Sequence, residues 1–250
     1  VLGVKTVPTG GWHTDHGVIQ IGTGALWVDP HDESAASNMV FLSNNLYRDS
    51  ADEWRAIVTD EATRYYQYGG EHYFDTAAST SAGSAVSFTN RLKIDSDGII
   101  TTPSQPAFMA NRNAGGCANN ATGDGTQVTL QFPDEEYDQN NDFDGTSTFT
   151  APVAGKYAFN ANVYLEDITT SHTTGYIIAT TTSDTITLEV NKPTNWEAAN
   201  GAYSMSTSWQ IDMASGDTCV VKLTISNGTK VIDIKGSTNK LNRFSGHLIC

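Results

Sequence analysis

The sequence predicts an all-β protein that ends in a two-sheet β-sandwich. Short apolar runs alternate with polar residues at period two, and Gly, Pro, Asn and Asp turns separate these runs. The clearest alternation runs from Tyr157 to Leu165, after a turn that contains Pro152 and Gly155. Neither an internal repeat nor a coiled-coil heptad interrupts this pattern.

The chain divides into two β-rich parts, residues 1–102 and 103–250. The stiff, non-helical segment Thr101–Pro106 carries two prolines and joins them. In the first part, strands over 18–21 and 25–28 flank the turn 22–24, and Gly69-Gly70 reverses the chain. We expect a turn over 59–62, with a short helix over 59–68 as the alternative.

The second part contains enough short strands for a complete sandwich. Turn residues punctuate it throughout, and such spacing is typical of double-sheet architectures. The expected strands cover 106–110, 127–132, 149–165, 175–179, 185–190, 204–211, 218–226, 231–234 and 244–249.

The composition excludes several classes of partner. Only 17% of the 250 residues are charged, and 28 acidic against 14 basic residues give a net charge of -14. This charge argues against a nucleic-acid surface and against adhesion to anionic lipid. No apolar run is long enough to cross a bilayer, so no membrane insertion is expected.

The chain has three cysteines, Cys117, Cys219 and Cys250. Their spacing matches neither that of a zinc site nor that of a disulfide framework. Cys219 alternates with apolar residues, so we expect it to be buried. Free thiols suit a protein that is assembled in a reducing cytoplasm.

Catalytic motifs are absent from the sequence, and we expect no enzyme. His13, His16 and His31 are spaced too loosely to predict a metal site. Glycoside hydrolysis needs two carboxylates that face each other across a cleft, and the adjacent acids of 134–136 do not provide this arrangement.

The densest polar constellation is Asp138, Asn140, Asp142 and Asp144, which alternate before Gly145. Calcium loops alternate oxygen ligands in this way, but the downstream Glu of an EF-hand is absent. A looser calcium site and a solvated acidic loop both remain open. No other cofactor is expected.

One tryptophan, Trp196, lies between Asn195 and Asn200 in a polar loop. It could stack on a sugar ring while the amides bind its hydroxyls, or it could cap one end of the sandwich. We expect the loops 113–126, 134–145 and 192–202 to form the contact surface for a receptor.

Two motifs in the second part resemble a known family. Phe149-Thr-Ala-Pro-Val-Ala-Gly-Lys-Tyr-Ala-Phe159 and Phe244-Ser-Gly-His-Leu248 resemble the globular head of complement component 1q, a jelly roll of the tumour-necrosis-factor (TNF) type. The resemblance implies a homotrimer that recognises a ligand, and members of this family can bind calcium. It places Phe149, Tyr157, Phe159, Phe244 and Leu248 in the core or the trimer interface.

The first part resembles modules of bacteriophage tail fibres over residues 44–98, most specifically over 76–98. This resemblance implies a trimeric fibre stem on a virion, assembled in the host cytoplasm and exposed on the particle surface. Its N-terminal side would bind other virion proteins, and the C-terminal knob would bind a host receptor, either a glycan or an outer-membrane protein. A head fibre or capsid decoration protein without receptor binding is the alternative. A depolymerase is disfavoured because no solenoid repeat is visible.

Overall fold

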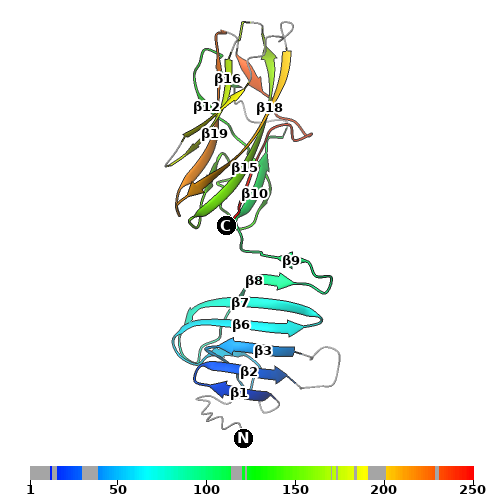
Figure 1. The fold of residues 1–250 in the computed structure, drawn as a ribbon, viewed down its shortest axis with the longest axis vertical. Coiled ribbons are helices and arrows are strands. Elements are labelled where there is room, and N and C mark those ends of the chain that lie inside the picture. The colour runs from blue at the N-terminus through cyan, green and yellow to red at the C-terminus, as the bar shows by residue number, and fades with distance from the viewer. Residues whose placement is uncertain are drawn as a thin grey trace. The chain divides into compact units, whose positions relative to one another are not determined.

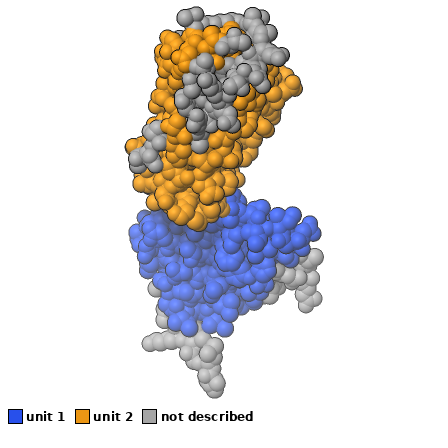
Figure 2. Space-filling view, turned by 45° about the horizontal axis from the view of Figure 1, so that its top comes forward, with its two compact units in different colours: residues 1–104 blue, residues 105–250 orange. Residues whose placement is uncertain are grey.

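The computed structural model describes residues 12, 16–29, 39–113, 120–121, 123–169, 171–172, 174–182, 185–190, 201–228 and 231–250. The chain forms two compact units, Val1–Ser104 (unit 1) and Gln105–Cys250 (unit 2), which Figure 2 colours separately. All regular elements in the described ranges are strands, which confirms the all-β expectation. The described part of the chain contains no helix that is long and apolar enough to span a membrane.

Unit 1 is built on one antiparallel seven-stranded sheet in the order β1-β2-β3-β6-β7-β8-β9 (Figure 1). A separate hairpin, β4 with β5, branches from it. The strands are β1 Gly17–Ile21, β2 Gly24–Asp29, β3 Met39–Asn44, β4 Leu46–Arg48, β5 Trp54–Ala56, β6 Asp60–Tyr68, β7 Glu71–Thr80, β8 Thr89–Ile94 and β9 Ile100–Thr101.

Local turn chemistry sets the register of this sheet. Gly69 and Gly70 have φ angles of 60° and 81°, and a two-residue hairpin turn with positive φ at both positions matches the twist of its strands. In the turn between β8 and β9, the Asp95 carboxylate accepts the amides of Asp97 and Ile99 at 3.0 and 2.8 Å.

The expected turn over 59–62 and the alternative helix over 59–68 are both wrong, because β6 already begins at Asp60. The buried Asn45 explains the difference. Its amide donates to the carbonyls of Val58, Asp60 and Glu61, and its oxygen accepts the Val58 amide at 2.9 Å. The chain therefore turns against the Asn45 side chain and enters the strand earlier than expected.

One face of the unit 1 sheet is covered by the chain itself. Trp27 and Phe41 stack there with ring centroids 4.0 Å apart, and Trp54 of β5 packs 5.2 Å from Trp27. The Arg64 guanidinium lies 3.8 Å from the centre of the Phe88 ring and pairs with Asp75 at 2.7 Å. We call this the covered face.

Unit 2 is a two-sheet sandwich. Its eight principal strands form the sheets β10-β21-β15-β18 and β14-β19-β16-β17 (Figure 1). When these strands are numbered along the chain, the orders are 1-8-3-6 and 2-7-4-5, the double Greek key of a jelly roll. The strands are β10 Ala107–Asn111, β11 Asn120–Ala121, β12 Val128–Thr129, β13 Asp134–Asp138, β14 Thr148–Thr150, β15 Gly155–Ile168, β16 Thr174–Thr181, β17 Thr185–Val190, β18 Gly201–Met213, β19 Thr218–Ser226, β20 Ile232–Ile234 and β21 Arg243–Leu248.

An aromatic cluster fills the space between the two sheets. Phe149, Tyr157, Phe159 and Phe244 are each 0% exposed, and Leu248 packs against them while partly buried. The Tyr157 hydroxyl donates to the carbonyl of Val153 at 2.8 Å, so its polar atom is satisfied within the core. These residues therefore lie in the core of a single protomer.

Three segments differ from the expected strand pattern. The first, 149–165, forms two strands, β14 and β15, rather than one. Only Val128–Thr129 is strand within 127–132, because Leu130 and Phe132 donate instead to the carbonyls of Val221 and Thr146, outside a regular ladder. The acidic segment begins with a strand rather than a loop, since β13 pairs with β10. Cys219 is buried, as expected.

Candidate functional site

The sandwich sheet β10-β21-β15-β18 presents a polar outer face. Phe159 and Ala161 of β15 point into the core, so Asn160 and Asn162 point outward. The strand register places Asn160 between Ser245 of β21 and Ser208 of β18. The next row places Asn162 between Arg243 and Ser206. We call this surface the polar face.

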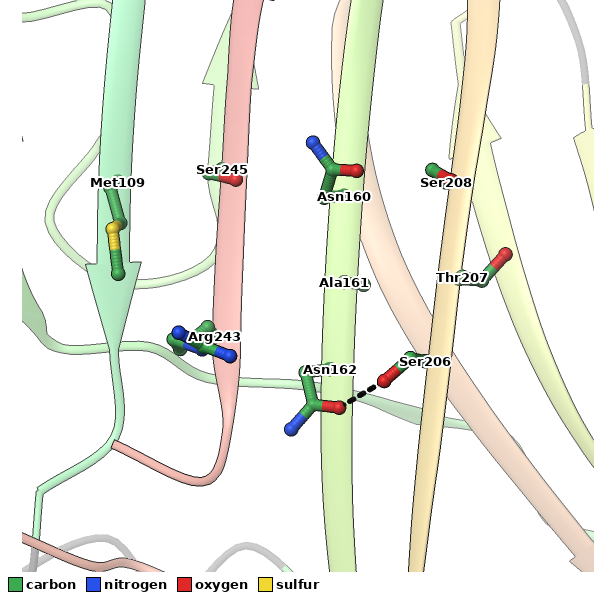
Figure 3. A pocket seen from close by; sticks show the side chains of 9 residues that line it. All are labelled: Met109, Asn160, Ala161, Asn162, Ser206, Thr207, Ser208, Arg243 and Ser245. Atoms are coloured by element: carbon green, nitrogen blue, oxygen red, sulfur yellow. Dashed lines mark hydrogen bonds between the residues drawn. The ribbon is translucent and has the colours of Figure 1, made fainter. Parts of the chain in front are cut away.

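A hollow of about 400 Å³ lies on the polar face. Its lining residues belong to β10, β21, β15 and β18, which are neighbours in one sheet that holds them in place, and Figure 3 shows their side chains. Its described lining residues are Met109, Asn160, Ala161, Asn162, Ser206, Thr207, Ser208, Arg243 and Ser245. A second hollow, of about 750 Å³, shares Asn160 and Ser208 and extends towards Gln210 and His247.

Hydrogen bonds orient the Asn162 amide. Its oxygen accepts from the Ser206 hydroxyl, drawn as a dashed line in Figure 3, and from the Ser204 hydroxyl at 3.5 Å. Its nitrogen donates to the carbonyl of Leu241. The Asn162 side chain is thus held from both ends, which leaves the neighbouring Asn160 as the exposed amide of the hollow.

The chemistry of the hollow is that of hydrogen bonding. Serine and threonine hydroxyls, asparagine amides and the Arg243 guanidinium supply donors and acceptors in a concave surface. The described lining of the hollow contains no carboxylate, histidine or cysteine. The side chains that are present can exchange hydrogen bonds with a hydroxyl-rich ligand.

The acidic segment 138–145 folds back on its own backbone. Asp138 accepts the amides of Asp142 and Phe143 at 3.1 and 2.8 Å. Asp144 accepts three successive amides, those of Thr146, Ser147 and Thr148. These carboxylates serve as turn caps.

The electrostatics of this segment follow from the same contacts. Partial burial raises the pKa of Asp142, and the neighbouring Asp138 adds to this increase. Burial would also raise the pKa of Asp144, but the amides of Thr148, Ser147 and Thr146 outweigh it and hold this pKa below its ordinary value. The described residues contain no cluster of three His, Cys, Asp or Glu side chains that could hold a metal. The calcium site formed by Asp138, Asn140, Asp142 and Asp144 stays a prediction.

The sequence-predicted receptor loops are only partly described. Trp196, Asn195 and Asn200 lie outside the described residues, as do 114–119 and 122 of the first loop. Sequence reasoning missed the polar face, although serines at 204, 206 and 208 alternate with buried Met205 and Trp209 along β18. The available signal was a strand with serines at three successive outward positions.

Comparison with known proteins adds a likeness of fold. Neither a protein-family model nor a curated protein matches the chain. Among solved structures, the chain is similar to the globular domain of zebrafish complement 1qA. Identity to that domain is 19%, over 59% of this chain and 98% of that one, with a TM-score of 0.38. It is also similar to murine APRIL at pH 8.0, with 10% identity, a TM-score of 0.40, and coverage of 58% of this chain and 100% of that one.

Proposed function

We propose that this chain is part of a bacteriophage fibre that binds the host cell surface through its jelly-roll unit. The observation that carries the proposal is the hollow on the polar face, lined by hydroxyls, amides and one guanidinium. In this proposal unit 1 belongs to the stem, three chains form the fibre, and the particle surface carries it. The receptor class is a surface glycan.

The side-chain chemistry of the hollow suits a glycan. Sugar hydroxyls act as both donors and acceptors, and the exposed Asn160 amide with the flanking Ser208 and Ser245 hydroxyls offers both functions. Arg243 adds a charged donor, which strengthens bonds to acidic or hydroxyl oxygens. Each such site binds weakly, and several copies on one particle convert weak contacts into avidity.

The proposal is tested by the binding of fluorescently labelled full-length protein to cells of the bacterium that hosts the virus. We expect the double variant Asn160→Ala, Arg243→Ala to bind at least tenfold less. The control Lys222→Ala removes a cation from the opposite sheet and should bind like the wild type.

Three results would contradict this function. Equal binding of the double variant and the wild type would place the receptor elsewhere. Binding to capsids without binding to cells would indicate a decoration protein. A fall in native mass of the double variant would make the polar face a contact between subunits rather than a receptor site.

A further inference from the structure

The second face of the unit 1 sheet is open and apolar. Because side chains alternate along a strand, the residues that face away from Trp27 and Phe41 lie together on this opposite side. Its central row crosses the sheet through Ile19, Leu26, Leu42, Tyr65, Phe74 and Leu92, which the register places opposite one another. We call this surface the open face.

The exposure of the open face is unusually large. Leu42 is 58% exposed, Leu26 46% and Phe74 40%, and a hollow of about 440 Å³ lies beside Leu42 and Phe74. The large apolar side chains of the open face that are at least 40% exposed are Ile19, Ile21, Leu26, Val28, Val40, Leu42, Phe74 and Ile100. At roughly 170 Å² for a fully exposed side chain of this kind, they expose on the order of 700 Å² of apolar surface.

Charge is nearly absent from the open face. Although the chain carries 28 acidic residues, none of the paired strand residues on this face is acidic. The cation Arg91 lines the hollow beside Leu42 and Phe74, where it donates to the hydroxyls of Thr76 and Ser104 at 2.9 Å. With no carboxylate among its paired strand residues, the open face offers no charge complementarity to a basic partner.

Three polar side chains of the open face, those of Tyr65, Gln67 and His72, hydrogen-bond to one another. The Tyr65 hydroxyl lies 2.6 Å from Nδ1 of His72, and Gln67 donates to the Tyr65 hydroxyl at 3.0 Å. Polar groups that are already paired can be buried without the cost of an orphaned donor or acceptor. The open face is thus suited to being covered.

We propose that the open face packs against the same face of other copies of this chain. An area of about 700 Å² is close to the roughly 800 Å² that each partner contributes to a stable protein interface, and it exceeds the usual largest patch of a monomer. Copies that each carry a net charge of -14 repel one another, so an apolar surface without carboxylates is where they can meet. This inference concerns assembly through unit 1 and does not depend on the proposed receptor.

The test measures the accessibility of the open face in the purified full-length protein. Leu42→Cys places a thiol on this face, and the control Val58→Cys places one in the β5–β6 connection, where the valine is 44% exposed. Maleimide labelling of each site is read by peptide mass spectrometry, with native mass measured by light scattering. Ile19→Cys repeats the probe if Leu42→Cys does not fold.

We expect a native mass of more than one chain and labelling of Leu42→Cys at least tenfold slower than that of Val58→Cys. Dilution to the monomer should make the two rates equal. The inference is overturned by a monomeric mass at all concentrations. It is equally overturned if the two thiols react at the same rate in an oligomer, which would show that the copies meet elsewhere. Neither result bears on binding of the jelly roll to cells.

Discussion

Gly246 lies where β21 passes beneath two buried rings, and its replacement by alanine is expected to destabilise unit 2. A Cβ atom at this position would lie 2.4 Å from Cδ1 of Phe159, 2.6 Å from its Cε1 and 2.9 Å from Cε1 of Phe108. Favourable carbon contacts are roughly 3.5–4.0 Å long, so the rings would have to move by about 1 Å. Both rings are 0% exposed and packed against further aromatic side chains.

The magnitude follows from two opposing effects. Overpacking a core by one methyl group costs about 1–3 kcal/mol, and the short distances place Gly246→Ala near the upper end. Alanine also restricts the unfolded chain, which offsets about 0.4–1 kcal/mol. We therefore expect a net loss of about 2 kcal/mol in the free energy of unfolding of unit 2.

Urea unfolding followed by hydrogen–deuterium exchange checks this value. Peptides from β15 report on unit 2 and peptides from β6 on unit 1, so the transitions are measured separately. A loss of 2 kcal/mol shifts the midpoint of the β15 peptides by about 1 M urea and leaves the β6 peptides unchanged. The control Ser245→Ala changes the neighbouring outward-facing residue and should shift neither midpoint.

A double variant tests the cause of the destabilisation. Phe159→Leu removes the ring atoms that Cβ would strike, so Gly246→Ala combined with Phe159→Leu should cost less than the two single changes together, by about 1 kcal/mol or more. The steric argument is refuted if Gly246→Ala lies within 0.5 kcal/mol of the wild type, or if the two costs simply add.

Two further predictions concern ionisable groups. Burial raises the pKa of the Cys219 thiol to about 12, whereas Cys250 is exposed. Maleimide at neutral pH should therefore modify Cys250 and spare Cys219 until denaturant is added. Equal rates of modification of the two thiols in the folded protein would contradict this prediction. The lowered pKa of Asp144 contributes stability that is present above its unfolded value near 3.8 and is lost as pH falls through the folded value. Between pH 6 and pH 3, the melting temperature of Asp144→Asn should therefore fall less than that of the wild type. An equal fall in the two proteins would disprove the capping role of Asp144.

Alternation and turn residues carried enough information for most of the fold. The alternation of Tyr157 to Leu165 predicted the central strand β15, and Gly69-Gly70 predicted the tight turn between β6 and β7. The boundary at Asp60 could not be predicted, because it depends on hydrogen bonds from Asn45, far away in the sequence. Strand β13 was missed because its acidic sequence reads as a loop, and only its pairing with β10 makes it a strand.

The surfaces were harder to predict than the core. The burial of Phe159 follows from apolar periodicity, and that of Phe149 and Phe244 follows from the family resemblance of their motifs. The polar face depends on which strands become neighbours, and Asn160, Ser208 and Ser245 come from three distant segments that only the jelly-roll topology brings together. The open face was missed for a related reason, because periodicity does not show which of two apolar sheet faces the chain itself will cover.

We propose that the jelly-roll unit binds a host surface glycan through its polar face. Isothermal titration of the full-length protein with oligosaccharides released from the host surface polysaccharide measures this binding. We predict saturable binding by the wild type and by Lys222→Ala, and at least a tenfold weaker affinity for the double variant Asn160→Ala, Arg243→Ala. Absence of binding by the wild type, or equal binding by the double variant, would contradict the claim.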